Sequence, residues 1–451
     1  MSAPAGAMRE APFVTGSTMR HVVVMTLTGA VGLMALFMVD LIDLFFLSLL
    51  NETAVTAAIG YAGTIVFANL SVSIGSGIAA AALVARNVGA GDMDRARQFA
   101  TSALMFSLLT AAVITLLINL GSGSVLTLLG AHGEAKRLAQ LFIWTMSPGY
   151  VLIAGAICCS FILRGLGDAK RAMYITLSTA IVTACADPVF IFGFKLGIQG
   201  AAAATVLGYI VSFAIGLHGV VRVHRFINPM RFGGLRRDFW PLWGIAFPAI
   251  LTQLAQPFAN AYITYEIAPF GDEAVAGFAI VGRLVPVAFG IIFSLAGSVG
   301  PIIGQNYGAK RHDRVRKALT DGLLFSGVYT LITSLILFLF RHQVAEAFNA
   351  AGRTVDIVVF FCTFIGISWA FAGGQFVANA AFNNLGRPKL STWFNWGKAT
   401  LGTVPFALVG ARLGGPEGLI AGTALGSVIF GIASVIAAYR IVRRSEIGVA
   451  R

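Results

Sequence analysis

Long apolar runs separated by short polar breaks set the pattern of this 451-residue chain. The runs are about twenty or more residues long and hold few charges, which is typical of membrane-spanning helices. Glycine, proline and charged residues mark the breaks between them. We predict twelve spans, at residues 20–50, 57–86, 97–121, 138–165, 172–194, 198–222, 238–269, 273–305, 315–341, 355–385, 390–411 and 417–441.

Composition and charge agree with this pattern. Hydrophobic residues make up 57% of the chain and charged residues 11%, whereas charged residues are about a quarter of a soluble domain. With both termini on one side, twelve spans place 24 of the 32 Lys and Arg residues in loops on that side. Basic loops stay in the cytoplasm. The net charge of +13 therefore sets the topology, and we expect cytoplasmic termini and no nucleic-acid partner.

The second half of the chain repeats the first at an offset of about 220 residues. Residues 51–55 resemble residues 271–275, and residues 200–208 resemble residues 418–426. Arg95 and Arg314 also occupy matching places. Six spans in each half make the repeats parallel, and such repeats enclose a cavity between them. We predict an all-α polytopic membrane protein with two six-helix lobes, at residues 1–222 and 238–451, and a cytoplasmic linker at residues 223–237.

Acidic residues inside the spans are the main candidates for function. Asp40 and Asp43 lie in the first span, and Asp187 lies in the fifth, directly before a proline. A carboxylate at mid-membrane costs roughly 2.5–3.5 kcal/mol, so it usually faces a water-filled cavity and binds a proton or a cation. Asp40 and Asp187 are the strongest candidates. Asp43 has two readings, as a residue of the same cavity or as a structural partner, and packing alone is the alternative for all three.

The order of short motifs along the chain resembles the multidrug and toxic compound extrusion (MATE) family of cation-coupled exporters. The resemblance covers nearly the whole chain and implies the two-lobe fold around a central cavity. The residues that carry it are Met38-Val39-Asp40, Gly89-Ala90-Gly91-Asp92, Arg164-Gly165-Leu166-Gly167-Asp168, Asp187-Pro188, Gly200-Ala201-Ala202-Ala203-Ala204-Thr205 and Gly304-Gln305-Asn306-Tyr307-Gly308-Ala309.

Within that family the chain is most similar to the DinF-like branch, which binds its coupling cation in the first lobe. The resemblance implies that Asp40, Asp187 and Thr205 hold the cation, and Thr183 stands where the branch has asparagine. Another branch uses carboxylates in spans 7 and 10, where this chain has Gln256 and Ala372. We therefore expect coupling to protons or sodium ions through the first lobe.

Several aromatic, Met and Gln side chains in the spans could line a substrate cavity. Such a surface suits flat lipophilic cations, through cation–π contacts and adaptable Met packing. Ordinary helix packing is the alternative for each of them. The candidates are Met34, Met38, Asp43, Gln253, Gln256, Tyr262, Phe289 and Phe293.

Several motifs of ATP-driven pumps, metalloproteins and enzymes are absent from the sequence. The sequence has no G-x-x-x-x-G-K-[ST] loop for ATP, no metal-ligand spacing of His or Cys, and no nucleophile–base pair. We therefore expect no cofactor, no metal and no enzymatic activity. The prediction is a monomeric multidrug exporter of the bacterial inner membrane, with organic cations and the lipid bilayer as partners. A lipid-linked precursor flippase is the alternative, although only Arg283 and Lys398 are basic residues within spans. An intramembrane enzyme is a third reading.

Overall fold

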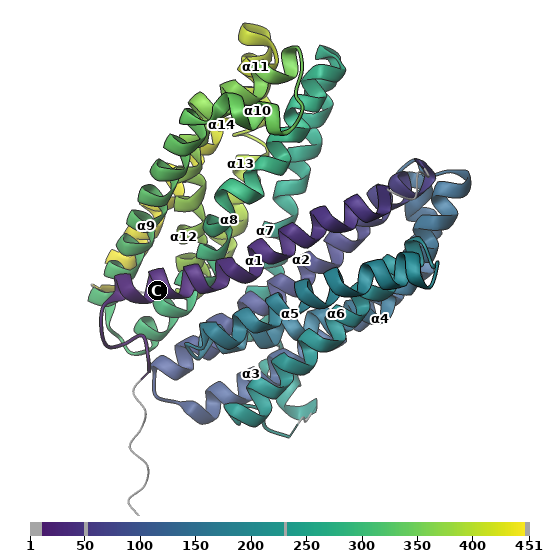
Figure 1. Ribbon diagram of the computed structural model, residues 1–451. Helices are drawn as coiled ribbons and strands as arrows, with labels where there is room; N and C mark the ends of the chain where they lie inside the picture. Colours follow the sequence, from purple (N-terminus) through teal and green to yellow (C-terminus); the bar gives the residue numbers. More distant parts are fainter. Residues whose placement is uncertain (1–10, 49–52, 230–231, 447–451) are drawn as a thin grey trace, which may run out of the picture. The chain divides into compact units, whose positions relative to one another are not determined.

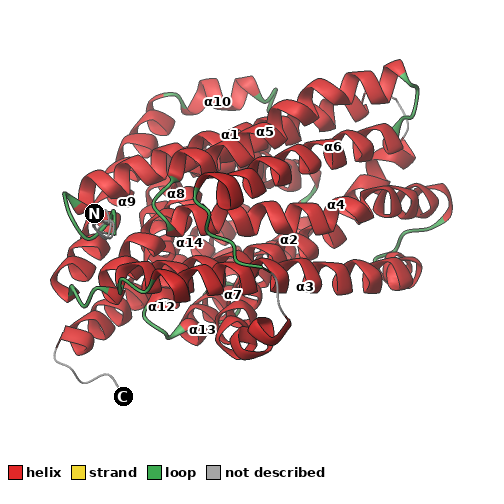
Figure 2. Ribbon diagram, turned by 90° about the horizontal axis from the view of Figure 1, so that it is seen from below, coloured by secondary structure: helices red, strands yellow, loops and turns green. Residues whose placement is uncertain are grey.

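The computed structural model describes residues 11–48, 53–229 and 232–446, and every regular element within these ranges is a helix (Figures 1 and 2). Most of the helices exceed the roughly twenty residues that cross a bilayer core. Their bounds are α1 (Thr18–Ser48), α2 (Thr53–Gly89), α3 (Met93–Leu128), α4 (Gly133–Gly165), α5 (Ala169–Pro188), α6 (Ile198–Leu217), α7 (Phe232–Ile267), α8 (Asp272–Gly308), α9 (His312–Leu339), α10 (Arg341–Ala347), α11 (Arg353–Phe360), α12 (Trp369–Asn384), α13 (Pro388–Ala399) and α14 (Val404–Glu446).

Ten helical stretches of these described ranges are long and apolar enough to span a membrane. The last of them, Pro388–Glu446, contains the final two predicted spans, because α14 is interrupted at Gly414 and Gly415. The seventh predicted span overlaps α7, a helix of 36 residues that is not among these ten stretches. The all-helical, multi-span fold predicted from the apolar runs is therefore confirmed.

Several predicted spans are not single α-helices. The sixth ends in a π-helical turn, His218–Val223, and the eleventh is broken between α13 and α14. The span at residues 355–385 changes to a π-helical and then a 3-10 turn at residues 361–368, between α11 and α12. The fifth span leaves α-helical geometry after Pro188 and continues as a π-helical turn, Val189–Gly193. Proline removes a backbone donor, and π-helical turns of this kind are frequent at functional sites.

The chain divides into two compact units. The first unit holds residues 31–88 and 92–250, and the second holds residues 89–91, residues 251 onward and the chain before residue 31. The unit boundaries fall inside α1, after Ala30, and inside α7, after Ile250. The lobe boundaries at residues 222 and 238 stay a prediction.

Each unit has its own helix packing. In the first unit, α4 packs against α3, α5 and α6, and α5 packs against α6. In the second unit, α12 packs against α8, α9, α13 and α14. Glycines permit close approach: a Cβ on Gly149 of α4 would lie 2.9 Å from Val206 Cγ2 of α6. Small residues at such contacts are typical of helix packing in lipid.

Two arginines that match in the repeat each hold the start of a long helix. In the second unit, Arg314 donates to the carbonyl oxygens of Phe13 and Gly16, both at 2.9 Å, just before α1. In the first unit, Arg95 forms an ion pair of 2.8 Å with Asp238 in the second turn of α7. Asp238 is fully buried and also accepts a hydrogen bond from Ser102. These contacts fix where α1 and α7 begin.

Asp168, in the turn between α4 and α5, is the best-paired acid of the predicted family motifs. Its side chain accepts from the backbone N–H of Arg171 at 3.0 Å and from His224 Nε2 at 2.8 Å, and it forms an ion pair with the Arg171 guanidinium. Burial acts to raise the pKa of this carboxyl, but the hydrogen bonds from His224 and Arg171 outweigh burial and hold the pKa well below its usual range. The residue therefore caps α5 as an anion.

Candidate functional site

Two carboxyl groups meet inside the first unit. Asp43 comes from α1, and Asp187 comes from the last turn of α5, directly before Pro188. Their side chains lie within hydrogen-bonding reach of each other. Asp187 is fully buried and Asp43 is half-buried. The pair lies within helical stretches that are apolar and long enough to span a membrane.

Three of the four carboxyl oxygens of the pair have no donor among the described residues. Asp43 Oδ1 and both carboxyl oxygens of Asp187 are buried, and no N–H or O–H group of the described residues donates to them. An ionised carboxyl group only accepts hydrogen bonds. Two unit charges 4 Å apart repel each other by about 4 kcal/mol at an effective dielectric constant of 20. The arrangement therefore requires a proton or a bound cation between the two groups.

Thr183 lies one turn before Asp187 on the same face of α5. Its side chain is 3% exposed, and its hydroxyl oxygen is buried without a hydrogen-bond partner among the described residues. Gly208 of α6 makes room for it, since a Cβ there would lie 2.6 Å from Thr183 Oγ1. A free hydroxyl beside the carboxyl pair could coordinate a cation or bond to a protonated carboxyl.

The other two predicted coupling residues stand outside this pair. Asp40 is exposed and interacts with the carboxylate of Asp43 only through its charge. The hydroxyl of Thr205 donates to the carbonyl oxygen of Ala201 in its own helix at 3.0 Å, which is common for threonines in spans. The structure thus brings Asp43, Asp187 and Thr183 together, while the sequence favoured Asp40 over Asp43.

Two tyrosines of the first unit were missed by the sequence reasoning. Tyr209 of α6 interacts electrostatically with both Asp40 and Asp43. Tyr150 of α4 is 1% exposed, its hydroxyl has no partner among the described residues, and it packs in one cluster with Tyr209. The available signal was spacing, because Tyr209 lies one helical turn after Thr205. These phenols add polar groups to the same region.

The predicted substrate residues fall in both units. In the first unit, Met34 is half-buried and Met38 is 54% exposed. In the second unit, Phe289 is fully buried and stacks on Trp369 at 5.1 Å, so it is a core residue. The side chains left with accessible surface there are Gln253, Gln256, Tyr262 and Phe293.

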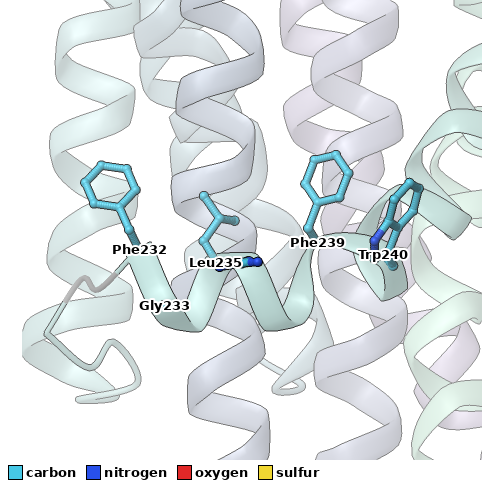
Figure 3. A pocket seen from close by; sticks show the side chains of 6 residues that line it. Phe232, Gly233, Leu235, Phe239 and Trp240 are labelled. Carbon is cyan, nitrogen blue, oxygen red and sulfur yellow. The ribbon is translucent and has the colours of Figure 1, made fainter.

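A shallow pocket lies at the start of α7 in the first unit (Figure 3). It contains none of the predicted site residues. Phe232 and Trp240 are strongly exposed there, and aromatic residues beside an arginine are typical of the membrane–water interface. We interpret it as an interfacial surface. Its lining residues are Phe232, Gly233, Leu235, Arg236, Phe239 and Trp240.

Comparison with known proteins identifies a family. The profile of the MatE family matches residues 30–189 and 248–409. The FAD transporter of Shewanella oneidensis is 28% identical, with 92% of this chain and 93% of that protein covered. The multidrug export protein MepA of Staphylococcus aureus is 23% identical over 73% of each chain. The Vibrio cholerae MATE transporter VcmN in the bent form has 25% identity and a TM-score of 0.90, covering 95% of this chain and 98% of VcmN.

Proposed function

The chain belongs to the MATE family of membrane transporters, and from this premise we propose that it is a secondary antiporter that exports small organic molecules in exchange for protons or sodium ions. The observation that carries the proposal is the pair of carboxyl groups of Asp43 and Asp187, three of whose oxygens are buried without a donor among the described residues. A pair that needs a proton or a cation between its members is suited to take one up on one side of the membrane and release it on the other.

The pair also offers a way to couple the ion to the helices. With a proton or cation bound, the two carboxyl groups attract each other and hold α1 against the end of α5. Without it they repel, and α1 and α5 are pushed apart next to the π-helical turn Val189–Gly193. Substrate and coupling ion would then favour different arrangements of these helices, which is the thermodynamic requirement for exchange. The site of action would be the bacterial inner membrane, with both termini in the cytoplasm and one chain as the working unit.

Two substrate classes are candidates. Organic cations are favoured by the multidrug export relatives, which include MepA. A flavin nucleotide is favoured by the FAD transporter of Shewanella oneidensis, which matches nearly the full length of the chain. The two classes have opposite charge, so transport of a matched set of probes separates them.

The test is transport in proteoliposomes under an imposed pH gradient or sodium gradient, with rhodamine 123 and FAD as probes. We expect one gradient to drive export of one probe by the native protein. Asp43→Asn should abolish this transport, because the pair can no longer exchange its proton or cation. Asp40→Asn is the matched control, with the same change on the same helix at an exposed position, and should keep most of the transport.

Two results would count against the proposal. Transport that ignores both gradients contradicts antiport. If Asp40→Asn abolishes transport and Asp43→Asn leaves it intact, the coupling group is Asp40 and the buried pair is structural.

A further inference from the structure

A ladder of polar side chains joins α12 to α13 inside the second unit. Ser391 Oγ donates to Asn383 Oδ1 at 3.2 Å, and Asn395 Nδ2 donates to Asn379 Oδ1 at 3.1 Å. All four residues are buried. Because the two helices run antiparallel, each step of about four residues along α12 meets the next turn of α13.

The register of these two hydrogen bonds, extended by one turn, predicts that Gln375 lies level with Lys398. Gln375 lies four residues before Asn379, and Lys398 lies three residues after Asn395, so each continues the face of its own helix. Gln375 is 2% exposed, and its side-chain Nε2 is buried without an acceptor among the described residues. On the α12 side the ladder therefore ends in a buried donor that has no acceptor among the described residues.

Lys398 lies too deep to be a surface residue. It follows Pro388, the first residue of α13, by ten positions, which places it about 15 Å along the helix, near the middle of a hydrocarbon core of about 30 Å. The side chain is half-buried, and no carboxylate of the described ranges interacts with it. At the repeat offset that relates Lys170 to Lys389, the first half has Thr179, so the repeat does not require a lysine here.

We propose that Lys398 and Gln375 form a subsite for an anionic oxygen group, a phosphate or a carboxylate, of the transported substrate. The inference rests on the proposed transport function and names the chemistry of its substrate. A lysine ammonium offers three donors and a charge, and the glutamine amide offers two more donors. A charge at mid-membrane is retained where it has a partner or a function, and a substrate anion would be that partner. The substrate class is accordingly an organic anion or zwitterion.

Equilibrium binding in nanodiscs tests the subsite without any gradient, so its outcome does not depend on the coupling pair. Fluorescein and rhodamine 123 are suitable probes, because they share one ring system and carry opposite charge. Lys398→Met should weaken fluorescein binding about tenfold to a hundredfold, since a hydrogen bond to a charged group contributes 1.5–3 kcal/mol. Rhodamine 123 should bind no more weakly than before. Lys398→Arg should retain most of the fluorescein affinity.

Two further variants separate recognition from folding. Lys389→Met makes the same change on the same helix at an exposed position and should leave both affinities unchanged. Gln375→Leu removes donors from the subsite without removing a charge and should weaken fluorescein binding alone. If Lys398→Met does not fold, Gln375→Leu tests the subsite in its place.

Three results would overturn the subsite. If Lys398→Met weakens the binding of fluorescein and rhodamine 123 equally, Lys398 is structural. Native protein that binds rhodamine 123 but not fluorescein means that Lys398 does not select an anion. If anionic phosphatidylglycerol in the nanodisc displaces fluorescein, whereas neutral phosphatidylcholine does not, the bound group is a lipid headgroup. Binding of fluorescein without gradient-driven transport would instead leave the subsite intact and count against the antiporter.

Discussion

Gly208 of α6 lies close to Thr183 of the candidate site, which makes Gly208→Ala a sharp test of the site geometry. A Cβ at this position would lie 2.6 Å from Thr183 Oγ1 and 3.1 Å from the carbonyl oxygen of Thr179. Ordinary van der Waals contact begins at 3.4 Å, so the threonine oxygen must move by about 0.8 Å relative to α6. The movement displaces the face of α5 that also presents Asp187.

The expected loss of stability is small, and the expected loss of function is large. Overpacking costs typically 1–3 kcal/mol, while replacing glycine by alanine in a helix gains about 1 kcal/mol. The net change in the free energy of unfolding is therefore a loss of about 0–2 kcal/mol. Transport should fall much further, because a displaced Thr183 and Asp187 no longer present their oxygens to one cation or proton.

The assay combines thermal unfolding in detergent with gradient-driven transport in liposomes. Gly63→Ala is the matched control, since a Cβ on this glycine of α2 would meet nothing within 4 Å. The control should be at least as stable as the native protein and should transport normally. If Gly208→Ala transports as well as Gly63→Ala, the close contact between α5 and α6 does not set the coupling geometry, and our account of the site fails.

Three further predictions concern single side chains. Thr183→Val should reduce coupled transport strongly and Thr205→Ala should not, because only the hydroxyl of Thr183 is free; equal effects in the liposome assay would contradict the placement of the site. Asp168→Asn should lower the free energy of unfolding at pH 7 by about 1–2 kcal/mol. Since the folded-state pKa of this carboxyl lies below its unfolded value, its contribution is complete above about pH 4 and is lost as the pH falls further, so melting curves of the two proteins should converge in acid. Asp238→Asn should cost roughly 1.5–3 kcal/mol, because it leaves Arg95 without its charged partner; a melting temperature equal to that of the native protein would refute this.

The fold was accessible from the sequence because the bilayer imposes strong constraints. Spans must be long, apolar and helical, and basic residues must gather on one side. The interruption at residues 361–368 was not predictable in the same way. At Gly366 the 3-10 turn packs closely against Ser334 of α9, and the apolar pattern continues through the interruption without a break.

The choice between Asp40 and Asp43 shows what the sequence leaves open at the site. The two residues lie three positions apart on overlapping faces of α1, so a modest rotation of the helix about its axis decides which of them meets Asp187. That rotation is set by contacts such as Gly32 of α1 with Thr176 of α5. The sequence contains Asp43 and Asp187 but gives no sign that these two residues touch.

A similar uncertainty affected Phe289 and Phe293. They lie four residues apart, which places them on one face of a regular helix. Phe289, three residues after Pro286, has non-helical backbone angles, φ −115° and ψ 15°. The distortion changes the direction of α8 at this point, and Phe289 is buried against Trp369 while Phe293 stays half-buried. A proline predicts a distortion but not the direction of each side chain after it.

The two arginine contacts at the starts of α1 and α7 bear on the ancestry of the chain. Arg95 of the first repeat holds the first helix of the second repeat, and Arg314 of the second repeat holds the segment before the first helix of the first. The unit boundaries within α1 and α7 show the same exchange. A single six-helix ancestor would have made both contacts by swapping its first helix with an identical partner, as a two-fold dimer. Fusion of two such copies would preserve the exchange, and each half would then depend on the other to hold its first helix.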